Sequence, residues 1–193
     1  RHRYNVLSLW SLHPFPSMVR VPEFPEVALN DVWRTKAKLD DTFSFAGSDM
    51  VRPEMLKDHE VVRRITIDEK IEFWRWVMQQ AADRGIRVYV FTWNVFTFGA
   101  DGKHGITNDL GNDITKKYFR ASVREMVKTY PLRAGMGITA GEGMPHDLDS
   151  KVKERWLWDT YGEGVRDALK DESRGSLREP TLDRGAIHDK REF

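Results

Sequence analysis

The strongest constraint on the fold is an amphipathic helix pattern that runs directly into an apolar strand. In "TIDEKIEFWRWVMQQAADRG", residues 66 to 85, Thr66 stands three residues before Glu69, and apolar side chains recur every three or four residues up to Gly85. The next stretch, "IRVYVFTWNVF" from 86 to 96, is almost continuously apolar, as is typical of a parallel strand covered on both faces. This order predicts one helix-to-strand unit of a parallel sheet.

The same alternation recurs along the chain. Residues 4 to 12, "YNVLSLWSL", predict a strand that stops at two prolines, and residues 134 to 140 predict another. Amphipathic helices are predicted at residues 112 to 131 and 149 to 172. Strands and helices that alternate in this way imply right-handed crossovers and a parallel sheet, either doubly wound or closed as a barrel.

Two further segments have weaker patterns. "PEVALNDVWRTKAKL", residues 25 to 39, has proline at a first helical position and a rough helical spacing of apolar residues, which predicts a helix. Between residues 40 and 65 only the alternation in "TFSF", residues 42 to 45, is typical of a strand. The tail from Ser173 is polar, and we assign it no element.

The segment after the first predicted strand decides between the two parallel folds. A doubly wound nucleotide-binding sheet would carry a glycine-rich phosphate loop there, whereas residues 10 to 18 read "WSLHPFPSM". We therefore expect an α/β fold of parallel (β/α) repeats. About four strands in 193 residues make half of a TIM-type (β/α)8 barrel, which needs roughly 250 residues. Residues 1–193 are expected to form one partial barrel domain, the amino-terminal half, and the start at Arg1 without a methionine indicates a segment of a longer chain.

Composition excludes several classes of function. The formal net charge is only +1, so no broad basic surface for nucleic acid is implied. The chain has no cysteine, and therefore no disulfide, thiolate metal site or thiol nucleophile. Its apolar runs fall short of the roughly 18 residues of a membrane span, and residues 1 to 25 are not a signal peptide. The histidines and aspartates show no metal-ligand spacing, so we expect no metal and no cofactor.

The candidate catalytic group is Glu142, in "GMGITAGEGMPHD" from 135 to 147. A carboxylate at the carboxyl end of a strand, among glycines that let a ligand approach the backbone, is well placed for proton transfer. Glycoside hydrolysis generally needs two such carboxyl groups. The alternative is that Glu142 caps the following turn or pairs with an arginine.

Other polar and aromatic residues follow the predicted strands, where the chemistry of a barrel is placed. The indole ring of Trp93 could stack on a sugar, and Asn94 could bind its hydroxyls, although adjacent residues of a strand point to opposite faces. His13 is a candidate hydrogen-bond donor to a sugar hydroxyl. The alternative is that its side chain stabilises its own loop. In the glycine-rich loop "FGADGKHGITND", residues 98 to 109, basic side chains could contact the carboxylate of a uronic acid. The candidate substrate-binding residues are Trp93, Asn94, His13, Lys103, His104 and His146.

"GMGITAGEGMPHD" resembles the fourth-strand segment of the α-glucuronidases of glycoside hydrolase family 67, and "RGIRVYVFTWNVF" is similar to their third strand. The resemblance covers residues 66 to 147. It implies a barrel glycosidase in which Glu142 is the general acid. The base carboxylates of that family lie on later strands and have no counterpart before Phe193.

Three functions stay open. The first is a carbohydrate-active barrel enzyme that hydrolyses glycosidic bonds, including those of glycans that contain uronic acids. The second is a non-catalytic carbohydrate-binding module on the same scaffold, and the third is a barrel lyase or isomerase that acts on a sugar acid. In each case the partner is a carbohydrate, with no nucleic acid and no membrane. An incomplete barrel would also expose strand edges and so favour self-association.

Overall fold

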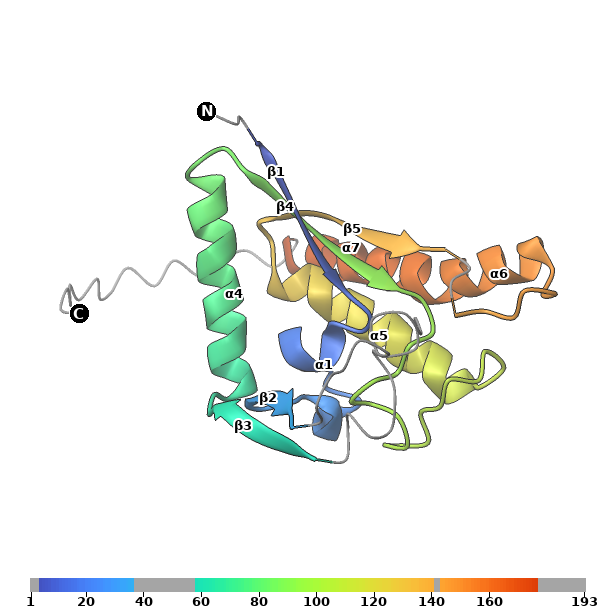
Figure 1. The fold of residues 1–193 in the computed structure, drawn as a ribbon. Helices are drawn as coiled ribbons and strands as arrows, with labels where there is room; N and C mark the ends of the chain where they lie inside the picture. The colour runs from blue at the N-terminus through green and yellow to red at the C-terminus, as the bar shows by residue number, and fades with distance from the viewer. Residues whose placement is uncertain (1–3, 37–57, 141–142, 177–193) are drawn as a thin grey trace.

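The computed structural model describes most of the chain, namely residues 4–36, 58–140 and 143–176. Its main sheet has three parallel strands in the order β1-β4-β5, and their bounds are Val6–Ser11, Arg87–Trp93 and Arg133–Thr139. The prediction of three parallel neighbours is confirmed (Figure 1). Because the order in the sheet follows the order in the chain, each crossover joins adjacent strands, as in the wall of a barrel. The closed barrel itself stays a prediction.

The predicted helices also lie where the sequence pattern places them. They are α4 (Ile67–Ala82), α5 (Asp113–Thr129) and a final helical stretch of α6 (Ser150–Leu157), a π-helical turn (Trp158–Gly162) and α7 (Glu163–Ser176). At the start of α4 the Thr66 side chain accepts from the Glu69 backbone N–H, and the Glu69 carboxylate accepts from the Thr66 backbone N–H. This capping box fixes the start of the helix.

The helices cover one face of the sheet. Along β4 the side chains of Val88, Val90 and Thr92 are buried, whereas Phe91 and Trp93 on the other face are partly exposed. The expectation that this strand is covered on both faces is therefore not met within the described residues. The open face carries aromatic rings: Trp10 of β1 is 54% exposed and stacks on Phe91 at 4.4 Å. Such a face is what closure of a barrel would bury, and self-association through it stays a prediction.

The helix predicted from residue 25 to 39 is wrong over residues 25–36, the part of it that the structure describes. Only a 3-10 turn forms there, at Pro25–Val27, and it is followed by strand β2 (Val32–Thr35), which pairs antiparallel with β3 (His59–Arg63). The 3-10 turn does not continue as a helix because the side chains of Asn30 and Asp31 form hydrogen bonds with a distant segment. The Asn30 side chain accepts from the backbone N–H of residue 67, and Asp31, at φ 61°, accepts from that of residue 65.

Two smaller elements also differ from the prediction. The loop expected after the first strand contains a short helix, α1 (Phe15–Met18), whose first turn includes proline. Strand β3 lies in the region without a clear period and was not predicted. The strand predicted at residues 42 to 45 lies outside the described residues.

The core lies between the sheet and its helices and is rich in aromatic rings. Phe119 of α5 is fully buried and contacts the rings of Phe15, Trp156 and Tyr161 within 6.1 Å between centroids. Helix α7 packs closely against α5 at Gly164. A Cβ atom at Gly164 would lie 2.6 Å from the Arg120 carbonyl oxygen. The missing side chain of this glycine is therefore what lets the two helices approach.

The substitution Gly164→Ala is expected to lower the free energy of unfolding by about 1–3 kcal/mol, because the added methyl group meets backbone that cannot move without shifting α5. Helix propensity alone predicts the opposite sign, since alanine is favoured over glycine by about 1 kcal/mol. Urea denaturation followed by circular dichroism measures the difference.

Gly162→Ala is the matched control. The three atoms nearest to a Cβ at this position all belong to the ring of Trp158, a side chain that is 52% exposed. Because this ring can shift toward solvent without moving backbone, the stability should change less than in Gly164→Ala. A Gly164→Ala protein as stable as the parent would contradict the close approach of α5 and α7.

Candidate functional site at the carboxyl ends of the strands

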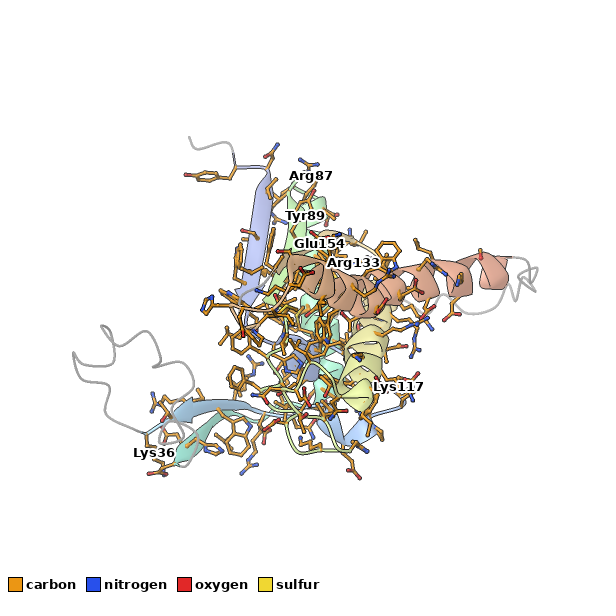
Figure 2. The ribbon with its side chains drawn as sticks, turned by 90° about the vertical axis from the view of Figure 1, so that its right-hand side faces the viewer. Lys36, Arg87, Tyr89, Lys117, Arg133 and Glu154 are labelled. Atoms are coloured by element: carbon orange, nitrogen blue, oxygen red, sulfur yellow. The ribbon has the colours of Figure 1, made fainter. Side chains whose placement is uncertain are left out.

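The carboxyl ends of the three parallel strands meet at one edge of the sheet. Ser11 pairs with Thr92, and Trp93 pairs with Thr139, so the strands end level with one another. The segments that follow them therefore leave from the same edge, where parallel α/β sheets carry their ligand sites (Figure 1). Figure 2 shows Arg87 and Tyr89 at the opposite end of β4, far from this edge.

Two adjoining cavities lie among these segments. The larger has a volume of about 610 Å³ and is bounded by the segment after β4, the segment after β5 and α6; the smaller has about 160 Å³. Asn108 and Gly143 line both. We call the two together the carboxyl-edge cavity. Its larger part is lined by charged and aromatic side chains, among them Asp109, Lys116, Arg155, Trp156 and Asp159.

The wall formed by the segment after β4 is held by hydrogen bonds within the loop. The Thr97 hydroxyl donates to Asp101 at 3.2 Å, and the Asp109 carboxylate accepts from the Gly111 backbone N–H at 2.9 Å. The Asn112 side chain caps α5 by accepting from its first N–H groups, and its amide donates to the Gly105 carbonyl. A long loop is thereby fixed to the start of a helix, which gives the cavity a defined wall.

Gly143 joins the two walls. Its φ is 78°, and a Cβ atom there would lie 3.2 Å from the Phe96 ring and 3.4 Å from the Asn94 carbonyl oxygen. Only glycine combines this left-handed backbone with so close an approach. The glycine after the candidate carboxylate therefore lets the segment after β5 pack against the segment after β4.

Glu142 itself lies outside the described residues, so its role stays a prediction. Its described neighbours in the chain bracket the site: β5 ends at Thr139, and Gly143 lines both parts of the cavity. Met144 is buried, with 4% of its surface exposed.

Trp93 and Asn94 are separated by the alternation of the strand. Trp93 lies on the open face, with its ring 5.6 Å from that of Trp10, and it is partly exposed. Asn94 is fully buried, so its amide is not open to a sugar hydroxyl in this structure. Of the two, we keep only Trp93 as a candidate binding residue.

His13 lies in the core rather than on the surface. Its Nδ1 is 2.6 Å from the Phe98 carbonyl oxygen, and its Nε2 is 3.1 Å from the Tyr118 hydroxyl. Burial lowers the pKa of His13 to about 4, against a smaller opposing effect of the bond to Phe98, so the ring is neutral near pH 7. A neutral ring that donates from Nδ1 and accepts at Nε2 satisfies both contacts. The alternative role, holding its own loop, is the one that these contacts support.

The remaining candidates, Lys103, His104 and His146, lie outside the carboxyl-edge cavity. The Lys103 ammonium donates to the Glu26 carbonyl at 3.1 Å, and His104 Nε2 is 3.5 Å from the Glu26 carboxylate, so both side chains tie the loop after β4 to the 3-10 turn. His146 is exposed, and neither it nor these two lines the carboxyl-edge cavity.

Several cavity residues were missed by the sequence reasoning. Phe96 and Phe98 stack at 5.5 Å between ring centroids in the smaller part of the cavity. Phe96 ends the apolar run from residue 86, and Phe98 opens the glycine-rich loop in which only the basic side chains were candidates. No local signal marks either ring as part of a cavity wall. Trp156 is a core residue, only 5% exposed, yet it also borders the larger cavity.

The comparisons with known proteins bear on the fold. No family model matches the chain, and no curated protein sequence matches it. Its fold is similar to part of a solved structure described as a GH138 enzyme targeting pectin rhamnogalacturonan II. The TM-score is 0.60 and the identity 23%, over 88% of this chain and 16% of that one.

This similarity shows that the two proteins share a fold over most of this chain. The chain spans 16% of the length of that enzyme, so the activity of the whole enzyme does not transfer with the fold. The resemblance to family 67 finds no support, because the similar structure belongs to another glycoside hydrolase family. Within residues 4–36, 58–140 and 143–176, no group of acidic and histidine side chains is arranged to hold a metal ion, and no helix is long and apolar enough to cross a membrane.

Proposed function

We propose that the chain is the amino-terminal part of a (β/α)8-barrel glycoside hydrolase that binds its carbohydrate substrate in the carboxyl-edge cavity. The observation that carries the proposal is the position of this cavity, at the carboxyl ends of parallel strands that follow the chain order. In barrel enzymes this edge holds the catalytic groups. The similarity in fold to part of a GH138 enzyme supports the same class of protein.

Glu142 is the general acid in this proposal. It stands three residues after the end of β5 in the chain, and Gly143, the next residue, lines the cavity. Apolar neighbours in the sequence, such as Ile138 and Met144, would disfavour the charged form and help to keep a proton available near neutral pH. A second carboxyl group, contributed by later strands of the barrel, would act as base or nucleophile.

The preferred substrate is a glycan that contains uronic acids. Arg155 of α6 lines the larger cavity, and its guanidinium makes no hydrogen bond or ion pair within the described part of the chain. A guanidinium binds a carboxylate through two parallel hydrogen bonds, which makes it suited to a uronate. Lys116, the other cation of this wall, already contacts Asp113 at 3.0 Å.

A substrate screen tests the proposal. The longer protein should hydrolyse members of a panel of aryl glycosides and aryl uronides. Arg155→Gln should raise KM for the uronides by about tenfold, since a charge-assisted hydrogen bond is lost, and should leave KM for neutral glycosides unchanged. Lys151→Gln, an exposed cation on the same helix outside the cavity, is the control. Sugar binding without turnover of any substrate would contradict hydrolysis and favour a binding module.

A further inference from the structure

A second large cavity lies between the β2–β3 hairpin and α4. It has a volume of about 620 Å³ and shares no lining residue with the carboxyl-edge cavity. The hairpin stands beside the amino-terminal end of α4 (Figure 1), and Figure 2 shows Lys36, next to β2, at the far end of the molecule from Arg87. We call this the hairpin cavity.

Aromatic rings form two of its walls. Trp33 of β2 and Phe73 of α4 line the cavity, and each is 49% exposed. Trp33 is held in place while exposed: its Nε1 donates to the Asn30 carbonyl at 3.3 Å, and its ring meets that of His59 edge-on at 4.8 Å. An exposed ring fixed in this way presents a flat apolar surface at little cost in side-chain entropy.

Basic groups stand beside these rings. The Arg63 guanidinium makes no hydrogen bond or ion pair within the described residues, and Arg64 has only a 3.8 Å ion pair, with Asp31. Lys70 is buried, and its ammonium donates to the carbonyls of Leu29 and Asp31, so it serves the loop rather than a ligand.

The acidic groups of the cavity are engaged. The Asp31 carboxylate accepts from the backbone N–H of Ile65 at 3.0 Å. The Glu69 carboxylate accepts from the Thr66 backbone and hydroxyl, and these bonds, with a smaller contribution from the charge of Arg63, lower the pKa of Glu69. Arg63 is consequently the cation most open to an incoming anion.

We propose that the hairpin cavity is a second binding site, for an acidic oligosaccharide. A pyranose ring packs between Trp33 and Phe73 through its C–H face, and a uronate carboxylate binds to Arg63. Aromatic platforms beside a guanidinium supply both the apolar and the charged contacts that such a sugar needs. The choice of a sugar over other flat anions rests on the proposed function. Because the site is separate from the carboxyl-edge cavity, it would retain an acidic polysaccharide without itself performing chemistry.

The test is a calorimetric titration of the protein with a short oligogalacturonate and with its fully methyl-esterified form. The acid form should bind, and raising the salt concentration should weaken it, since the charged groups are near the surface. Trp33→Ala should raise the dissociation constant by about tenfold, because it removes the main aromatic surface on which the sugar packs. Arg63→Gln should weaken binding of the acid form by about fivefold and leave the ester unaffected.

Matched controls lie on α4 and just after it, outside the cavity. Trp76 of α4 is 59% exposed and does not line the cavity, so Trp76→Ala should bind as the parent does, and Arg84→Gln should do the same. Circular dichroism checks that Trp33→Ala retains the fold, and Arg63→Gln tests the site without removing a packed ring.

The outcomes separate this site from the proposed function. Binding that is lost in Arg155→Gln but kept in Trp33→Ala and Arg63→Gln would place the sugar in the carboxyl-edge cavity and overturn the second site. Equal binding of acid and ester would overturn the role of Arg63. Failure of the substrate screen with Trp33-dependent binding intact would refute hydrolysis while supporting the hairpin cavity.

Discussion

In the glycoside hydrolase proposed above, Glu142→Gln is expected to lower kcat by about a hundredfold or more on substrates with poor leaving groups. Glutamine keeps the shape and hydrogen bonding of the side chain but has no proton to transfer to the glycosidic oxygen. Substrates with activated aryl leaving groups depart without protonation, so their turnover should fall much less. Steady-state kinetics on both substrate types measures the contrast.

The control for this variant is Asp147→Asn, an exposed carboxylate in the same segment that lines neither part of the cavity. It should leave both activities near those of the parent. Equal losses on the two substrate types in Glu142→Gln would indicate a binding role. No loss on either would return Glu142 to the capping or ion-pair alternative.

The second large effect concerns pH and the buried His13. Its pKa in the folded protein is about 4, against an ordinary value of 6.5. Between these values the unfolded chain binds a proton that the folded protein does not, so acidification favours unfolding. The contribution of His13 is fully present above pH 6.5 and is lost as the pH falls to 4, with a slope of up to about 1.4 kcal/mol per pH unit.

Among the pKa shifts found in the described residues, only that of His13 makes the free energy of unfolding depend on pH between 5 and 6.5. The carboxyl groups whose pKa is lowered by their partners, Asp68, Glu69 and Asp167, start from ordinary values of 4.5 or below and act at lower pH. Urea denaturation between pH 5 and 7 should therefore show falling stability in the parent and a flatter profile in His13→Gln.

His146→Gln, which removes an exposed histidine, should keep the slope of the parent. If His13→Gln does not fold, an NMR titration of the parent reports the His13 pKa directly, and a value near 6.5 would contradict the neutral buried ring.

The pH dependence of His13 also concerns the candidate site, because the Nδ1 of His13 bonds to the carbonyl of Phe98, a residue that lines the smaller part of the carboxyl-edge cavity. Protonation of His13 would disturb the loop that forms this wall.

The elements whose signals are local could be predicted from the sequence. The capping box of Thr66 and Glu69 marked the start of α4, and the apolar run after Gly85 marked β4. Periodicity placed α5 and the α6–α7 stretch, and the succession of these units implied parallel strands. These signals suffice because capping, amphipathic spacing and short crossovers depend on residues close together in the chain.

For the candidate site, the sequence predicted only an edge of the sheet, the one at the carboxyl ends of the strands. A cavity lies among the segments after the strands, but Asn94 and His13 are buried. The local sequence around a single polar residue at a strand end does not indicate whether its side chain faces a cavity or the core. The cavity walls come instead from Asn108 and from the contact of Gly143 with Phe96, which join segments that are distant in the chain.

Two features depend on contacts between distant parts of the chain and could not be predicted: the conformation of the segment after Pro25 and the close packing of the last helices. A helical pattern yielded to the β2–β3 hairpin, because Asn30 and Asp31 bond to backbone groups more than thirty residues away. Gly164 weakens a helix by its propensity, yet it is the residue that lets α7 lie against α5. Such long-range pairing and close packing override local preference, since each becomes favourable only when both partners are already in place.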